Sequence, residues 1–263
     1  ATSAELGVII PPSIPLILFG VAAEVSIGEL FIAGIGPGIL IGGALMLFVY
    51  LHAKFKGWGK EDGDGRMGIV KATWQALFAL FMPFIILGGI YGGIFTPTEA
   101  AAVAVFYALV VGGVVYREIS FADLGRILKK SVLSSAVIMF IIANAGLFAF
   151  LITRAGVPDA IGHWLEQVLK TPAMFLLGIN VALFFIGMFI ETSAAILVLA
   201  PILVPVAVHF GIDPIHFGLI MVVNLALGMI TPPFGVNLFA ACTVAKIPLD
   251  KIVGHLVPFV LVI

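Results

Sequence analysis

Residues 227–233 are Leu-Gly-Met-Ile-Thr-Pro-Pro and end an apolar run that begins at residue 219. Proline has no backbone N–H and its ring clashes with the helical turn before it, so a pair of prolines interrupts a helix. Because the interruption follows apolar residues directly, it falls at membrane depth. Interrupted helices are tolerated there only where they line a cavity or are buried in protein. The pattern therefore predicts a broken transmembrane helix.

The same pattern occurs near the start of the chain. Residues 6–12 are Leu-Gly-Val-Ile-Ile-Pro-Pro and align without gaps to residues 227–233 at an offset of 221. The alignment extends without gaps over residues 6–37 and 227–258, but only six of these 32 positions are identical. The Leu-Gly-x-Ile-x-Pro-Pro core therefore carries the evidence. Matched broken segments are typical of transporters built from inverted repeats. If the repeat is complete, the first copy should also contain counterparts of residues 134–226, and these would precede Ala1. We therefore expect a large N-terminal part to be absent.

Composition excludes an ordinary soluble domain. The 263 residues are 62% hydrophobic and 10% charged, whereas soluble domains carry about 25% charged residues. The sequence predicts an all-α polytopic membrane protein whose solvent is the lipid bilayer. Runs long enough to cross it as helices are residues 28–51, 74–95, 100–116 and 132–153.

Charge is concentrated in two loops. Nine of the thirteen Lys and Arg residues lie in residues 52–71 and 117–130. The two basic loops are separated by two spans, so they share one side of the membrane, and the basic excess predicts that this side is cytoplasmic. No basic groove exists for a nucleic acid, which is excluded as a partner. Residues 155–170 predict a short interfacial or connecting amphipathic helix.

Thr96-Pro-Thr-Glu99 matches a helix start. Thr96 suits the N-cap, Pro97 the first helical position, and Glu99 the position that reaches back to the cap. The alternative is that Glu99 is a proton or ion ligand within the membrane.

The segment that begins at Thr231 is a candidate binding site. We expect Thr231 to cap a helix that starts with Pro232 and Pro233 in its first turn, at membrane depth. Such a start offers free N–H groups and a positive dipole end to a carboxylate, and unwound carbonyls to Na⁺. Gly235 permits close backbone approach, and Asn237 offers a donor and an acceptor. The alternative is a proline kink that only shapes packing.

The repeat adds Pro11, Pro12 and Ser13 as the matching candidate residues. It also supports a site, rather than a simple kink, at the second break.

Glu191-Thr192-Ser193 separates two apolar stretches, residues 173–190 and 194–210. These are either two spans with an external turn, or a re-entrant hairpin whose tip lies at mid-depth. The downstream prolines favour the hairpin. A Glu and two hydroxyls supply hard oxygen ligands for Na⁺. Helix capping by Thr192 or Ser193 is the alternative.

Three amides, Asn144, Asn180 and Asn224, lie in apolar helices, where hydrogen bonds between helices are the commoner use. Enzyme signatures are missing: the sequence has no metalloprotease His pair, no Gly-x-Ser-x-Gly and no P-loop. We therefore expect a protein that is not an enzyme, does not hydrolyse ATP and has no cofactor.

Four motifs in order resemble the large membrane subunit, the DctM-type M subunit, of the tripartite ATP-independent periplasmic (TRAP) transporters. They are Ile-Ile-Pro-Pro-Ser-Ile-Pro at 9–15, Gly-Ile-Phe-Thr-Pro-Thr-Glu-Ala-Ala-Ala at 93–102, Pro-Ile-Leu-Val-Pro at 201–205 and Gly-Met-Ile-Thr-Pro-Pro-Phe-Gly-Val-Asn-Leu at 228–238. The match covers nearly the whole chain, which is similar to a C-terminal portion of that subunit.

The resemblance implies an elevator-type carrier in the bacterial inner membrane. Residues 1–27 and 171–263, the latter with a truncated final span, would belong to the transport domain, and residues 28–170 mainly to the scaffold. It also implies Na⁺ as the coupling ion, with Thr192, Ser193 and Thr231 as candidate ligands. The family's hairpin tip often carries an acid and Thr-Thr, so Glu191-Thr-Ser is a conservative departure.

The implied partners are a small Q-type membrane subunit and a periplasmic solute-binding protein that delivers an organic acid. Two other classes compete with this interpretation. A dicarboxylate or citrate symporter of the same superfamily would work without a binding protein, and an intramembrane enzyme would need catalytic residues that the sequence lacks.

Overall fold

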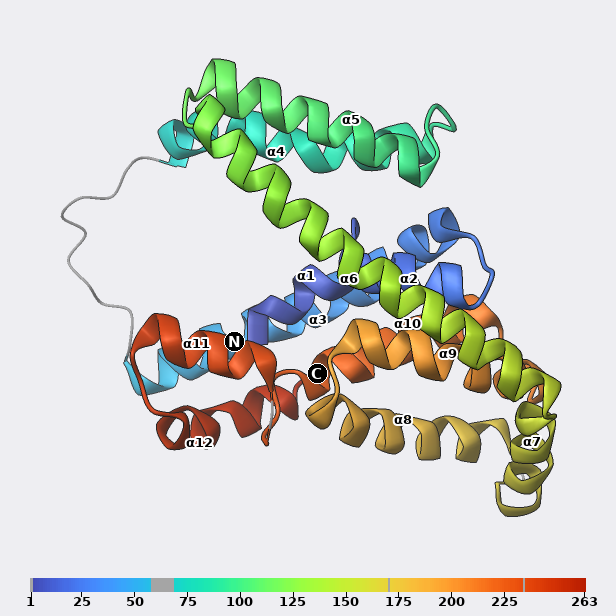
Figure 1. Cartoon of the computed structure of the whole chain (residues 1–263). Coiled ribbons are helices and arrows are strands. Elements are labelled where there is room, and N and C mark those ends of the chain that lie inside the picture. Colours follow the sequence, from blue (N-terminus) through green and yellow to red (C-terminus); the bar gives the residue numbers. More distant parts are fainter. Residues whose placement is uncertain (1, 58–68, 170, 234) are drawn as a thin grey trace. The chain divides into compact units, whose positions relative to one another are not determined.

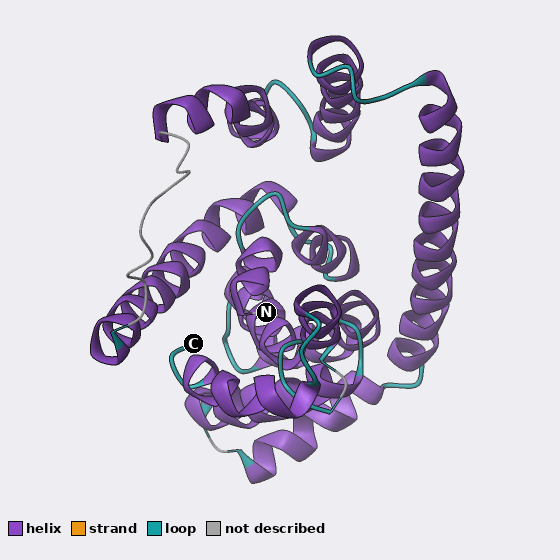
Figure 2. Ribbon diagram, turned by 90° about the vertical axis from the view of Figure 1, so that its left-hand side faces the viewer, coloured by secondary structure: helices purple, strands orange, loops and turns teal. Residues whose placement is uncertain are grey.

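The computed structural model describes residues 2–57, 69–169, 171–233 and 235–263. Helices and loops make up this part of the chain, with no strand among the described residues (Figures 1 and 2). The elements in the first half are η1 (Thr2–Glu5), α1 (Leu6–Ile9), α2 (Ile14–Ala22), α3 (Ile27–Lys56), α4 (Ile69–Tyr91), α5 (Pro97–Val110) and the π-helix η2 (Val111–Val115). Those in the second half are α6 (Phe121–Arg154), α7 (Val157–Val168), α8 (Pro172–Phe189), α9 (Thr192–His209), α10 (Pro214–Gly228), α11 (Val236–Ala245) and α12 (Leu249–Val260).

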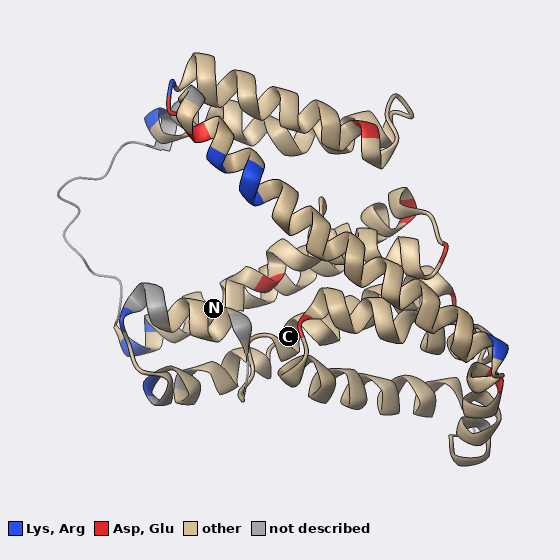
Figure 3. Ribbon diagram, in the orientation of Figure 1, with Lys and Arg blue, Asp and Glu red and all other residues tan. Residues whose placement is uncertain are grey.

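Five helical segments in the described residues are long and apolar enough to cross a membrane: Ile27–Lys56, Pro97–Val115, Ala122–Arg154, Pro172–Phe189 and Thr192–His209. A sixth candidate is a broken pair, Thr2–Ile9 and Ile14–Ala22, bent by 46° at the first proline pair. α8, α9 and α10 contain no Asp, Glu, Lys or Arg at all (Figure 3). The prediction of an all-α polytopic membrane protein is confirmed.

The chain forms two compact units, and each is described by itself. The first unit comprises Ala1–His52 and Phe140–Ile263, and the second comprises Ala53–Met139. The domain boundaries expected from the sequence and the elevator motion both stay predictions.

In the first unit, α10 is the central helix. It packs against α8 and α9, and α9 also packs against α2. α10 also packs against α2, and the absence of a side chain at Gly218 allows the two helices to approach closely. A Cβ atom on Gly218 would lie 2.4 Å from the ring of Phe19. Phe19 is fully buried, so this contact forms part of the core.

The two proline pairs occupy equivalent places in the order of elements. Pro11-Pro12 lies between α1 and α2, with α3 next, and Pro232-Pro233 lies between α10 and α11, with α12 next. Both Pro–Pro bonds are cis. The offset of 221 therefore matches the proline breaks, and it matches the helix starts that follow them to within one residue. The inverted orientation of the two repeats stays a prediction.

In the second unit, α4 and α5 pack against each other, and the hydroxyl of Tyr107 donates to the carbonyl oxygen of Phe78 at 2.7 Å. The predicted capping box at the start of α5 is confirmed. Glu99 N–H donates to Thr96 Oγ1, and Thr96 N–H donates to Glu99 Oε2 at 2.8 Å.

The prediction of a basic loop over residues 117–130 is wrong for most of its length, because α6 begins at Phe121. Ser120 and Asp123 form a reciprocal cap, in which Asp123 N–H donates to Ser120 Oγ and Ser120 N–H to Asp123 Oδ2. The other basic loop falls mostly on residues 58–68, which lie outside the described residues. The amphipathic segment at 155–170 is the helix α7, as predicted.

Candidate functional site

The turn between α8 and α9 meets the C-terminal end of α10. Thr192, 1% exposed, places its hydroxyl 2.8 Å from the sulfur of Met229, the C-cap residue of α10. Beneath this contact the backbones of α8 and α10 touch, and a Cβ atom on Gly228 would lie 2.3 Å from the carbonyl carbon of Gly187. The structure therefore brings Thr192 to the start of the second break. We call residues 187–193 and 228–231 the tip corner.

Glu191, rather than Thr192 or Ser193, caps α9. Its Oε2 accepts from Ala194 N–H at 3.0 Å, and its Oε1 accepts from the Ser193 hydroxyl at 2.8 Å. The predicted alternative of capping by Thr192 or Ser193 is wrong. A carboxylate reaches the third N–H of the helix as well as a hydroxyl does, and its charge suits the positive end of α9. The Thr192 side chain is left to face α10.

Thr231 does not cap α11, and Pro232 is not in its first turn, so this prediction is wrong. The N-cap is Gly235, and α11 begins at Val236. Thr231 instead extends the end of α10: its N–H donates to Gly228 O at 2.9 Å, and its hydroxyl to Leu227 O at 2.9 Å. Because these bonds hold Thr231 to α10, Pro232 and Pro233 form the turn that leads to α11.

Gly235 lies against the backbone at the end of α10, and its part in a binding site stays a prediction. A Cβ atom there would lie 2.8 Å from the carbonyl oxygen of Met229 and 3.0 Å from that of Thr231. The backbone N–H of Asn237 donates to Met229 O at 3.2 Å. Thus Thr231, Gly235 and Asn237 all lie at the end of α10, and the Thr192 hydroxyl contacts Met229 at the same end.

Helix dipoles give the tip corner its electrostatics. The C-terminal ends of α8 and α10 carry partial negative charge and touch at Gly187 and Gly228. The positive end of α9 lies at the same corner, but the Glu191 carboxylate covers it. With the Thr192 and Thr231 hydroxyls, the corner supplies oxygen atoms and negative potential, which suit a small cation.

The first break is organised by its own hydrogen bonds. Ser13, 1% exposed, caps α2 by accepting from Leu16 N–H at 3.4 Å, and its hydroxyl donates to the carbonyl oxygen of Val8. Gly34 of α3 packs against the first break. A Cβ atom on Gly34 would lie 3.0 Å from the carbonyl oxygen of Ile9 and 3.7 Å from the side chain of Pro11. Pro11 is buried and Pro12 exposed. Ser13 is therefore occupied in a cap in this conformation.

The predicted interhelical amide bond is confirmed for one pair. Asn224 on α10 donates to Asn180 Oδ1 on α8 at 2.5 Å and also to Ile220 O at 2.7 Å. Asn144 differs, since it donates to Phe140 O one turn back in its own helix.

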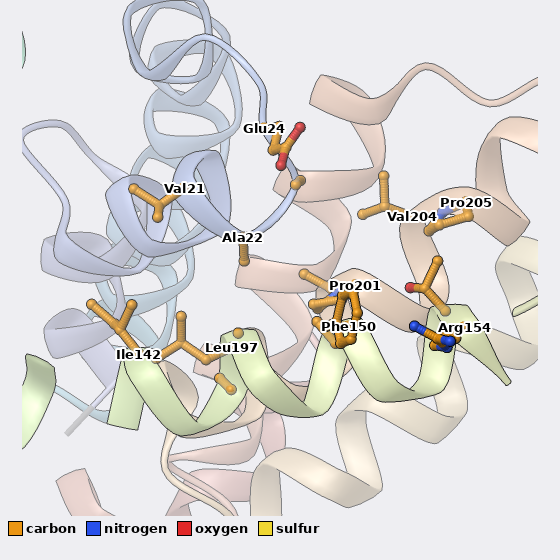
Figure 4. A pocket seen from close by; sticks show the side chains of 16 residues that line it. Val21, Ala22, Glu24, Ile142, Phe150, Arg154, Leu197, Pro201, Val204 and Pro205 are labelled. Atoms are coloured by element: carbon orange, nitrogen blue, oxygen red, sulfur yellow. The ribbon is translucent and has the colours of Figure 1, made fainter. Parts of the chain in front are cut away.

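A cavity of about 700 Å³ lies between the end of α2, the C-terminal half of α6 and the middle of α9 (Figure 4). Its wall is apolar except for Glu24, Thr153 and Arg154. Pro201 and Pro205 both line it. Because each lacks an N–H, the carbonyl oxygens of Leu197 and Pro201 are without their usual helical partners. Pockets of this size accommodate small organic molecules.

Sequence reasoning missed this cavity and one further residue, Glu5. Arg154 and Glu24 are separated by 130 positions, and no local motif marks either. Glu5 precedes the first repeat core, and its carboxylate oxygens are buried with no hydrogen-bond partner in the described part of the chain. An acid beside an apolar broken helix was the available signal.

Comparison with known proteins gives a consistent answer. The family model "Tripartite ATP-independent periplasmic transporter, DctM component" matches residues 1–263. The isethionate TRAP transporter permease protein DctMQ of Oleidesulfovibrio alaskensis is 44% identical over 99% of this chain and 41% of its own length. The C4-dicarboxylate TRAP transporter large permease protein DctM of Pseudomonas aeruginosa is 44% identical over 98% of this chain and 60% of its own length.

A third relative, the sialic acid TRAP transporter large permease protein SiaM of Vibrio cholerae, is 39% identical over 98% of this chain and 60% of its length. This chain thus spans 41% of the DctMQ relative and 60% of the other two. The family match extends over every described helix, and its members are permeases rather than enzymes. The chain belongs to the DctM component family of the tripartite ATP-independent periplasmic transporters.

Proposed function

We propose that the complete protein is the large permease subunit of a TRAP transporter that couples Na⁺ entry to uptake of an organic acid. As a member of its family, the chain is a multi-pass protein of the bacterial inner membrane. The observation that carries the coupling proposal is the tip corner, where the C-terminal ends of α8 and α10 meet beside the Thr192 hydroxyl. A cation bound there is stabilised by two helix dipoles and neutral oxygen ligands.

The energy source follows from the same argument. The family is ATP-independent by description, so the gradient of an ion must drive accumulation. One Na⁺ that moves down a potential of 100 mV supplies about 2.3 kcal/mol. If the rest of the moving complex carries no net charge, two such ions can drive a solute concentration gradient of roughly a thousandfold. Thr192, Ser193 and Thr231 are the candidate Na⁺ ligands.

The cavity at Arg154 supports an anionic solute. The wall contains one acid, Glu24, and one base, Arg154, and the guanidinium of Arg154 can pair with a carboxylate of the solute through two parallel hydrogen bonds. The names of the relatives report a C4-dicarboxylate, sialic acid and isethionate, all anions. We therefore assign a small organic anion, most simply a carboxylate, to this cavity.

Two partners complete the proposal. The word "tripartite" in the family description supports a small membrane subunit and a periplasmic solute-binding protein. One relative bears the combined name DctMQ.

The test uses the full-length permease with its small subunit in proteoliposomes, and the binding protein outside. Uptake of labelled succinate, sialic acid and isethionate is measured with Na⁺ outside, then with K⁺ in its place. Uptake of at least one solute should depend on Na⁺ and on the binding protein. Equal uptake in K⁺ refutes the coupling, and equal uptake without the binding protein identifies a binding-protein-independent symporter instead.

A further inference from the structure

Glu5 is a buried acid that no part of the proposed cycle uses. It ends η1, directly before α1, and its side chain is 1% exposed. Both carboxyl oxygens are buried without a hydrogen-bond partner among the described residues. Buried polar atoms are rarely left unpaired in proteins, so each such group needs a physical explanation.

The surroundings of Glu5 are apolar. η1 packs against α1, α10 and α12. The next residue, Leu6, packs with the cluster of Ile9, Ile41 and Leu45, to which Val223 of α10 and Phe259 of α12 also belong. These contacts place the C-terminal halves of α10 and α12 beside the start of the chain.

The titratable side chains that the structure describes on α10 and α12 lie near the N-terminal ends of these helices. α1 has no titratable residue, and the titratable residue of α10 is His216 in its first turn. On α12, Lys251 precedes Phe259 by eight residues, which is about 12 Å along a helix. The side chains of Asp250 and His255 lie outside the described set. Near η1, a cavity of about 420 Å³ is lined by Thr2, Ser3 and Tyr50, among others.

Burial decides which form of Glu5 this site holds. An ionised carboxylate without a partner loses its hydration and gains nothing in return, at a cost far above that of burying the neutral acid. Within a membrane such groups take up a proton, pair with another charge, or bind an ion. The described part of the chain offers Glu5 no opposite charge within hydrogen-bond distance.

We propose that Glu5 is a proton-binding site: in the conformation seen here it carries a proton taken from water. Separation of η1 from α10 and α12 hydrates the carboxyl group, which then releases its proton to water. The packed and separated conformations therefore differ in proton affinity, and by linkage a lower pH favours the packed one. Its position before the first broken helix makes the packing of that helix sensitive to protons, independently of the solute.

Infrared difference spectroscopy tests this directly, because a protonated carboxyl group absorbs at a frequency distinct from that of a carboxylate. The sample is the full-length permease with its small subunit in liposomes at about pH 7, where a hydrated Glu is ionised. Wild type should show a protonated-carboxyl band that Glu5→Gln removes. Glu29→Gln, which alters an exposed acid on α3, is the matched control and should retain the band.

Glu5→Asp keeps an acid at the position and should shift the band rather than abolish it, which carries the test if Glu5→Gln does not assemble. A spectrum without the band in wild type, or a band unchanged in Glu5→Gln and Glu5→Asp, overturns the proposal. So does loss of the band on adding Na⁺ at constant pH, which would identify a cation site instead.

Discussion

Gly187 and Gly228 hold the backbones of α8 and α10 in direct contact, and a Cβ atom on Gly228 would lie 2.3 Å from the carbonyl carbon of Gly187. No larger residue fits at Gly228 without moving a backbone. The contact fixes the distance between the two helix ends that form the tip corner, and hence the position of Thr192 relative to Met229.

Gly228→Ala should therefore destabilise the protein. The added methyl group meets backbone atoms, which cannot rotate away, so we expect a loss of about 1–3 kcal/mol, the usual cost of overpacking. Thermal unfolding of the purified full-length protein measures it. Gly36→Ala is the control, since a Cβ atom there meets nothing within 4 Å on helix α3. Equal melting temperatures for Gly228→Ala and wild type would contradict the contact.

Asn180 and Asn224 should behave as a coupled pair. Either single change to Leu leaves the other amide with one fewer partner between α8 and α10, at a cost of about 0.6–2 kcal/mol. The double variant should lose less than the sum of the singles, because neither amide is then left behind. Asn144→Leu, whose amide bonds within its own exposed turn, should change the melting temperature little. Strictly additive losses would mean that the two amides do not interact.

Glu191 combines a cap and a charge, and two variants separate them. Glu191→Ala removes the cap of α9 and should cost about 1 kcal/mol of stability. Glu191→Asn can still cap but lacks the charge, so it should retain stability and raise the Na⁺ concentration for half-maximal uptake. If Glu191→Asn keeps the wild-type Na⁺ dependence, the carboxylate serves the helix alone.

Topology can be tested at two turns that the sequence places on opposite sides of the membrane. In a Cys242→Ser background, a cysteine at residue 63 should resist an impermeant thiol reagent added outside intact cells. A cysteine at Gly93, in the turn between α4 and α5, should react. The reverse pattern would invert the predicted orientation.

Local rules predicted a large part of the fold. Hydrophobic runs located the spans that correspond to α3, α5 and α6, and Thr96-x-x-Glu99 gave its capping box, because both depend on neighbours in sequence. The run at residues 74–95 corresponds to α4, whose apolar part, Ala76–Tyr91, is shorter than the other spans. Ser120-x-x-Asp123 is a similar signal that would have placed the start of α6 correctly. The repeat located both proline breaks, although α11 begins at Val236 and not at the expected Pro232.

Tertiary contacts decided what the sequence could not. Threonine is a common N-cap residue, which is why the sequence predicts that Thr231 caps α11. Its hydrogen bonds to Leu227 and Gly228 instead make it part of the end of α10. The burial of Glu5 depends on α10 and α12, more than 200 residues away in the chain. The cavity at Arg154 exists because α2, α6 and α9 come together, which no local pattern records.

The central claim is that the tip corner binds Na⁺ through hydroxyl oxygens. Thr192→Val keeps the shape of the side chain and removes its oxygen, and Met229→Leu removes the sulfur that the hydroxyl contacts while leaving the oxygen in place. The measurement is the Na⁺ concentration for half-maximal uptake by the full-length complex in proteoliposomes, with assembly checked by gel filtration. We expect Thr192→Val to raise it about tenfold, equivalent to about 1.4 kcal/mol, and Met229→Leu to leave it within about twofold of wild type. An unchanged Na⁺ requirement in Thr192→Val, or the same shift in both variants, would show that this hydroxyl only packs against Met229 and would contradict the assignment of the cation to this corner.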